Sequence, residues 1–307
     1  MKYIIGHKNP DTDTICSAIG YQAFLEARNI KSEALALGSI NKETKFVLTY
    51  FGVDLPREVS ELPHNSEIIL VDHNEESQSI DNLNELDIIE IIDHHKVKIQ
   101  TDKPIRIHVE PLGSSCSIIA KKYFAKNLEI SKEVAGLLLA GIISDTLYFR
   151  SPTTTETDKE LVKKLNEIVE IEDLAEFSML MFYAKSDMSD IKTKDLIKLD
   201  YKVFEFGGAE YGIGVMETTN KDAGLERKEE ILENLTQVKK TDNLKGAFLS
   251  IIDILNKESY TLCSGNEEKE LFIEMFKAED REDVLFVDGI VSRKKEIVPV
   301  FENHLNK

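Results

Sequence analysis

Short apolar segments that lead directly into aspartate and histidine residues are the feature that most constrains the fold of this chain. One segment ends before residues 6–13, a second at 67–71 ends before Asp72, and a third at 88–92 ends before Asp93. Stretches with helical spacing lie between them. This alternation predicts right-handed crossovers and a mostly parallel sheet. The carboxyl ends of parallel strands share one edge, where such folds bind ligands.

Two domains are expected in a chain of 307 residues. Small polar residues break the apolar periodicity after residue 184, and we place a linker at 186–194. It separates a first domain over 1–185, in which helices flank the parallel sheet, from a smaller α/β domain with a mixed sheet over 195–307. The last part of the second domain, 284–300, is expected to be a strand region.

The composition limits the possible partners. A net charge of -18 disfavours long nucleic acids and anionic membranes, because phosphate polymers are held mainly by a surplus of Lys and Arg. The three scattered cysteines form no CxxC pair, so neither a disulfide framework nor a thiolate zinc site is indicated. No secretory leader is recognised, and the longest apolar run is about half a membrane span. We expect a cytoplasmic protein that binds neither nucleic acid nor membrane.

The polar residues after the strands have the composition of a metal site. Imidazole and carboxylate ligands without thiolates suit Mn²⁺, Mg²⁺, Co²⁺ or Zn²⁺. Asp145 joins them from the end of an apolar helix, where an ionised carboxylate needs a cation. Six ligands are too many for one ion with open positions, and they suit two ions that share a carboxylate. The candidates are His7, Asp11, Asp13, Asp72, Asp145 and one histidine of the pair His94 and His95.

Each candidate also has a simpler interpretation. An aspartate before an amphipathic helix is an ordinary N-cap, and the helix dipole favours it there. His73 is disfavoured as a ligand, because adjacent residues of a strand point to opposite faces. For the same reason, one of His94 and His95 should bind metal and the other should face the substrate. Histidines without acidic neighbours of this kind are taken as structural: His64, His108 and His304.

A basic run near the C-terminus supplies the complementary charge. Arg293, Lys294 and Lys295 lie within the expected strand region 284–300 of a strongly acidic chain. Such a run is usually a solvated face, but Arg offers a bidentate fork to phosphate oxygens and Lys a compact charge. Lys202, at the start of the second domain, is a further candidate. A small anionic substrate therefore remains compatible with the acidic composition.

Taken together, these motifs resemble those of the DHH phosphoesterase superfamily. Within it, the chain looks most like the family II, manganese-dependent inorganic pyrophosphatases. The resemblance spans nearly the whole chain, and the C-terminal Ser-Arg-Lys-Lys element makes the set of motifs highly specific. The matching stretches are residues 6–14, 71–75, 93–95, 143–146, 151–153 and 292–295.

The resemblance implies a role for each motif, a homodimer, and an active site in a cleft between domains that open and close. Some members carry inserted nucleotide-binding modules, but the roughly twenty residues between the second and third motifs leave no room for them. Two Mn²⁺ or Co²⁺ ions, bridged by Asp72, would be held by His7, Asp11, Asp13, Asp72, His94 and Asp145. Pyrophosphate, which arrives with Mg²⁺, would be bound by His95, Lys202, Arg293 and Lys294.

The expected reaction is hydrolysis of pyrophosphate to two orthophosphates by a hydroxide held between the two metal ions. Metal binding lowers the pKa of water toward ~7, so no side-chain base is required. One rival is a DHH enzyme that cleaves short oligonucleotides or polyphosphate. Oligonucleotide-cutting relatives usually carry a glycine-rich element with a histidine, whereas Gly207 and Gly208 here have no histidine nearby. The other rival is a non-catalytic metal-binding or interaction protein.

Overall fold

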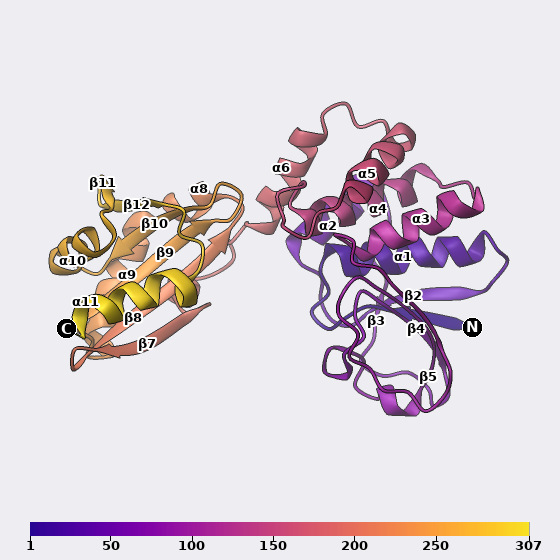
Figure 1. Cartoon of the computed structure of the whole chain (residues 1–307), viewed down its shortest axis with the longest axis horizontal. Helices are drawn as coiled ribbons and strands as arrows, with labels where there is room; N and C mark the ends of the chain where they lie inside the picture. Colours follow the sequence, from indigo (N-terminus) through magenta and orange to yellow (C-terminus); the bar gives the residue numbers. More distant parts are fainter. Residues whose placement is uncertain (307) are drawn as a thin grey trace. The chain divides into compact units, whose positions relative to one another are not determined.

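The computed structural model describes residues 1–306, which form two compact units (Figure 1). The first unit is Met1–Lys185, and the second begins at Ser186. The residues predicted as a linker, 186–194, fall within the second unit. Ser186 Oγ lies 2.6 Å from Thr219 Oγ1, and helix α7 (Thr193–Ile197) begins inside the predicted linker.

Sheet A of the first unit confirms the predicted parallel sheet. Over the described part of the chain it has six strands, all parallel, in the order β3-β2-β1-β4-β5-β6. The central strands are almost entirely apolar, as expected of parallel strands covered on both faces. Strand order reverses at β1, which pairs with β2 on one side and β4 on the other, and such a reversal creates a binding crevice. The strands are β1 Lys2–Ile5, β2 Ser32–Ala36, β3 Arg57–Glu58, β4 Glu67–Val71, β5 Asp87–Asp93 and β6 Arg106–Val109.

Helices α1, α3, α4 and α5 lie together on one side of sheet A (Figure 1). Helix α1 begins after Asp11, whose side chain accepts a hydrogen bond from the backbone N–H of Thr14 at 2.9 Å. Helix α4 is buried over most of its length, as its apolar sequence predicts. The helices are α1 Thr12–Glu26, α2 Lys42–Phe51, α3 Ser115–Lys126, α4 Lys132–Thr146, α5 Glu156–Val169 and α6 Leu174–Lys185.

The second unit contains a mixed sheet, as predicted. Its strand order over the described residues is β11-β12-β10-β9-β8-β7, with β8 and β9 parallel and the other pairs antiparallel. Helix α9 packs Ile231 and Leu235 against one face, while α10 and α11 pack Phe272 and Phe301 against the other. The strands are β7 Tyr201–Phe206, β8 Ala209–Thr218, β9 Gly246–Asp253, β10 Glu258–Cys263, β11 Glu279–Arg281 and β12 Val284–Asp288. The remaining helices are α8 Lys221–Leu225, α9 Lys228–Thr241, α10 Asn266–Phe276 and α11 Val298–Leu305.

The prediction of a strand region at 284–300 is wrong beyond strand β12. A π-helical turn, Arg293–Ile297, follows and leads into α11. The Ser292 hydroxyl accepts from the backbone N–H of Lys295 at 3.3 Å, and the Glu296 carboxylate accepts from the backbone N–H of Ser292 at 2.9 Å. These local hydrogen bonds start a helix, and they cannot be predicted from the spacing of apolar residues in the sequence.

Each helix among residues 1–306 is too short or too polar to span a lipid bilayer.

Candidate metal centre

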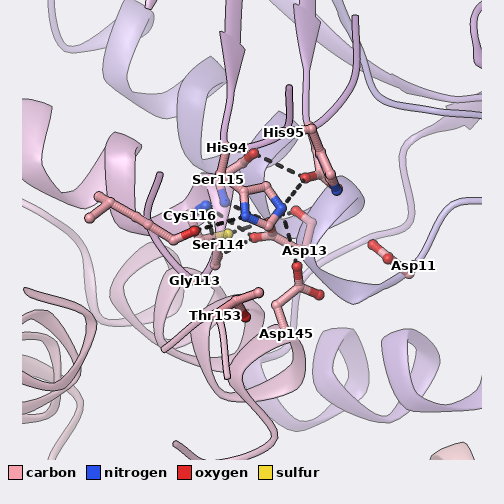
Figure 2. Close-up of polar contacts among 12 residues, drawn as sticks. Asp11, Asp13, His94, His95, Gly113, Ser114, Ser115, Cys116, Asp145 and Thr153 are labelled. Atoms are coloured by element: carbon pink, nitrogen blue, oxygen red, sulfur yellow. Dashed lines mark hydrogen bonds and ion pairs between the residues drawn. The ribbon is translucent and has the colours of Figure 1, made fainter. Parts of the chain in front are cut away.

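The predicted metal ligands come together at the carboxyl edge of sheet A. His7 follows β1, Asp72 follows β4 and His94 follows β5, so three neighbouring strands direct side chains to one place. This is the edge at which the strand order reverses, where open α/β sheets bind ligands. In Figure 2, Asp13, His94 and Asp145 point toward one another. The other ligands come from helix ends: Asp11 and Asp13 from the start of α1, and Asp145 from the last turn of α4.

Asp72 belongs to two groups of potential ligand atoms. In the first, His7 Nε2 lies 3.6 Å from Asp11 Oδ2 and 3.6 Å from Asp72 Oδ2. In the second, which also contains Asp13, His94 Nε2 lies 3.4 Å from Asp72 Oδ1 and 3.4 Å from Asp145 Oδ2. The two oxygens of Asp72 therefore face different groups of potential ligand atoms. Asp72 adopts a left-handed backbone conformation with φ 60°, which Asp tolerates better than most residues.

The two histidines present a free nitrogen to these groups. His7 Nδ1–H donates to the carbonyl oxygen of Lys8 at 2.8 Å, and His94 Nδ1–H donates to that of Leu112 at 3.0 Å. A neutral imidazole held in this way keeps the lone pair of Nε2 available for a metal ion. His94 Nε2 is buried and lacks a hydrogen-bond partner among residues 1–306, so the donor set fits a metal ion.

The carboxylates of the cluster repel one another. Complete burial, followed by the charge of Asp72, raises the pKa of Asp13 to about 7. Burial and the charges of Asp13 and Asp72 raise the pKa of Asp145 well above its usual range. A carboxylate crowded by like charges favours its neutral form unless a cation joins the group. A bound cation would therefore relieve the repulsion between these carboxylates.

The histidines respond in the opposite sense. Burial acts to lower the pKa of His7, but the close approach of Asp11 and the charges of Asp72 and Asp11 outweigh it and raise this pKa to about 9. Burial likewise opposes the charged form of His94, yet Asp72, Asp13 and Asp145 together raise its pKa to about 10. Without metal, both imidazoles are therefore protonated at neutral pH.

Hydroxyl groups that the sequence did not point to hold two of the carboxylates. Asp13 lies against the first turn of α3, where it accepts from Ser114 Oγ at 2.6 Å and from the backbone N–H of Ser115 at 2.7 Å. Asp72 accepts from Thr14 Oγ1 at 2.6 Å and from Ser115 Oγ at 3.0 Å. In the sequence, Ser114 and Ser115 look like the ordinary start of a helix, so the sequence gives no sign of their contacts with Asp13 and Asp72.

The last two residues of the DHH motif have different surroundings. His94 lies inside the cluster, whereas the side chain of His95 is 55% exposed and lines a cavity of about 670 Å³ beside it. His95 Nδ1–H donates to Asp93 Oδ1 at 2.9 Å, and this hydrogen bond raises the pKa of His95. Asp93 in turn accepts from Asn74 Nδ2 at 2.5 Å. Asp93 thus orients His95, which also lies close enough to Asp72 and His94 to form a third potential ligand group.

Both ring nitrogens of His73 have hydrogen-bond partners outside the cluster. Its Nδ1 lies 2.9 Å from the carbonyl oxygen of Val71, and its Nε2 lies 3.1 Å from Ser79 Oγ. Both ring nitrogens are therefore engaged within the protein.

The predicted basic residues lie in the second unit. Lys202 is exposed on β7, opposite Ile213 of β8. Arg293 donates to the carbonyl oxygens of Asp200 at 2.5 Å and Ile213 at 3.3 Å, and to Asp200 Oδ1 at 2.5 Å. The β7–β8 hairpin and the π-helical turn therefore bring Lys202 and Arg293 to the same part of this unit, and Lys294 is exposed on that turn.

Comparison with known proteins covers the whole chain. Residues 2–142 match the DHH family N-terminal domain, and residues 179–304 match the DHHA2 domain. The chain is 42% identical to the manganese-dependent inorganic pyrophosphatase of Methanocaldococcus jannaschii, with 100% of both chains covered. It is 38% identical to the manganese-dependent inorganic pyrophosphatase of Bacillus subtilis, with 97% of this chain and 96% of the relative covered. A solved structure described as a family II inorganic pyrophosphatase of Methanococcus jannaschii has a TM-score of 0.66 and 42% identity, with 100% of both chains covered.

Proposed function

The chain belongs to the manganese-dependent inorganic pyrophosphatases of the DHH family, and we propose that it hydrolyses pyrophosphate to two orthophosphates with a water activated by two divalent metal ions. The observation that carries the two-ion proposal is the position of Asp72. Its two carboxylate oxygens face separate ligand groups, one around His7 and the other around His94.

Charge balance supports two ions rather than one. The four carboxylates carry four negative charges when ionised, and both histidines are neutral when they act as ligands. Two divalent ions supply four positive charges and make the centre neutral. Oxygen-rich ligation with imidazole suits Mn²⁺ or Co²⁺, while Mg²⁺ would accompany the substrate. We assign one ion to His7, Asp11 and Asp72, and the other to Asp13, Asp72, His94 and Asp145.

When bound, the two ions would activate water near neutral pH and neutralise charge on the phosphate groups. The chain's own residues orient the reacting groups. Thr14 and Ser115 fix the two oxygens of Asp72. Asp93 holds His95 and favours its protonated form, so His95 Nε2–H can donate to a phosphate oxygen facing the cavity.

Arg293, Lys294 and Lys202 are proposed to bind the pyrophosphate. A guanidinium binds two phosphate oxygens at once, and ammonium groups add compact charge. The family resemblance supports these roles, and so does the placement of Lys202 and Arg293 in the same part of the second unit. The homodimer and the cytoplasmic location predicted from the sequence remain predictions.

Phosphate release from pyrophosphate tests the proposal. Metal-free protein should be supplied separately with Mn²⁺, Co²⁺, Zn²⁺ and Mg²⁺, and a dinucleotide and long-chain polyphosphate should be compared as substrates. We expect rapid release from pyrophosphate with Mn²⁺ or Co²⁺, and the Asp72→Asn variant should lose both metal and activity. Cleavage of the dinucleotide or the polyphosphate without release from pyrophosphate would instead support the rival DHH enzymes.

A further inference from the structure

Glu43 is a completely buried carboxylate that belongs to none of the motifs. It lies in the first turn of α2, next to the helices that carry the metal ligands. Its Oε2 accepts hydrogen bonds from Thr12 Oγ1 at 2.9 Å and from Ser144 Oγ at 2.8 Å, and Lys185 Nζ lies 3.4 Å from the same oxygen. Burying a carboxylate costs free energy, so the presence of Glu43 in the protein interior needs an explanation.

The two hydroxyl partners sit beside metal ligands in the sequence. Thr12 lies between Asp11 and Asp13 at the start of α1, and Ser144 directly precedes Asp145 in α4. A single oxygen of Glu43 therefore joins two segments, far apart along the chain, that carry three of the six proposed ligands.

The other oxygen of Glu43 argues against a purely stabilising role. Glu43 Oε1 is buried and has no hydrogen-bond partner among the described residues. An unpaired buried oxygen costs stability, and an apolar side chain of similar size often replaces a buried charge without loss. What an apolar side chain could not supply is the oxygen that accepts from both hydroxyls.

We propose that Glu43 is a positioning residue of the metal centre, which fixes the backbone carrying Asp11, Asp13 and Asp145 without touching the ions. This inference rests on the proposed two-ion function and adds a residue outside every motif. Groups that orient metal ligands from behind typically change metal affinity 10–100-fold when they are removed, roughly the effect expected here.

Glu90 provides a matched control in the same unit. It is also a buried carboxylate whose Oε1 has no hydrogen-bond partner among the described residues, and its Oε2 accepts from Tyr21 Oη at 2.8 Å. Neither Tyr21 nor Arg106, its ion-pair partner at 3.6 Å, adjoins a proposed ligand. Glu90 lies in β5, but its side-chain partners do not adjoin a ligand, so its loss reproduces the loss of a buried charge without removing a hydrogen bond to a residue next to a ligand.

The experiment measures Mn²⁺ affinity by titration calorimetry on metal-free, full-length protein. We expect Glu43→Leu to weaken Mn²⁺ binding roughly 10–100-fold, Glu43→Gln to restore part of the affinity because its amide oxygen still accepts, and Glu90→Leu to bind as the parent does. The melting temperature of metal-free Glu43→Leu should not fall below that of Glu90→Leu, because the role is in positioning. Parental affinity in Glu43→Leu, or an equal loss in Glu90→Leu, would overturn the proposal.

Two further variants keep the test decisive. If Glu43→Leu does not fold, Ser144→Ala removes the donor that precedes Asp145 and should itself weaken Mn²⁺ binding; parental affinity there would overturn the inference. Asp72→Asn separates this inference from the proposed function. Loss of Mn²⁺ in Asp72→Asn with normal binding in Glu43→Leu refutes only the role of Glu43, whereas normal binding in Asp72→Asn refutes the metal centre itself.

Discussion

Manganese binding should release protons from the two histidines that we propose as ligands. In the metal-free protein, burial is outweighed by neighbouring carboxylates, which raise the pKa of His7 to about 9 and that of His94 to about 10. Both imidazoles are therefore protonated at about pH 7.5. Only the neutral imidazole binds a metal ion, so each histidine must lose a proton when the centre fills.

The number of released protons determines how strongly affinity depends on pH. Each proton released changes the binding constant by tenfold per pH unit, about 1.4 kcal/mol, so two protons correspond to about 100-fold, or about 2.7 kcal/mol, per unit. Affinity rises with pH while His7 and His94 are both protonated, and this rise becomes shallower as pH passes about 9 and then about 10. Asp13, with a pKa of about 7, adds a further proton below neutrality.

Titration calorimetry measures this release directly. Metal-free protein is titrated with Mn²⁺ at about pH 7.5 in buffers of different ionisation enthalpy, and the slope of the observed heat gives the proton number. We expect at least two protons for the filled centre, from His7 and His94, with any further protons coming from Asp13 and Asp145, whose pKa values are also raised. Histidines with the ordinary pKa of about 6.5 would be mostly neutral at this pH. A release close to zero would therefore refute the electrostatic description of the centre.

Three further predictions concern the substrate, the DHH motif and the metal-free state. Arg293→Ala should lower turnover and weaken pyrophosphate binding while Mn²⁺ content stays intact, and unchanged hydrolysis would rule out its proposed role. Asp93→Asn replaces the carboxylate that favours protonated His95 with a neutral amide, so the basic limb of the kcat/KM profile should move to lower pH; an unmoved limb would contradict the role of His95. Metal-free protein should lose stability as pH rises toward about 10. The raised pKa values of His7 and His94 stabilise the fold fully below about pH 6.5, and this contribution is lost as the pH rises through about 9 and about 10. The raised pKa of buried Asp13 likewise makes the fold less stable as the pH rises, up to about pH 7. A constant melting temperature over this range would contradict it.

The edge of sheet A was predictable because each strand there combines two local signals. Glu67–Val71 is apolar enough to read as a buried strand, and Asp72 follows it at once. The same holds for the strand that ends at Asp93. Parallel strands that connect through helices must place these ends side by side, so local sequence and a general rule of topology are sufficient.

The basic turn shows where local sequence misleads. Apolar residues on both sides of Arg293 suggested a strand, yet Glu296 and Ser292 form side-chain hydrogen bonds to the backbone and start a helix. Hydropathy carries no information about such bonds, because they depend on the backbone conformation that they stabilise.

Ser115 and Glu43 could not be predicted for a different reason, which is that each already has a sufficient local explanation. A serine at the start of α3 is an ordinary helix start, and a glutamate in the first turn of α2 is what the helix dipole favours. In the folded chain, Ser115 Oγ reaches Asp72 at 3.0 Å, and Glu43 accepts from Ser144 at 2.8 Å, 101 residues along the chain. A residue that satisfies a local rule gives no sign of a second, long-range role. Residues that hydrogen-bond to metal ligands, or to the neighbours of ligands, are therefore hardest to recognise at helix starts, where polar residues are expected in any case.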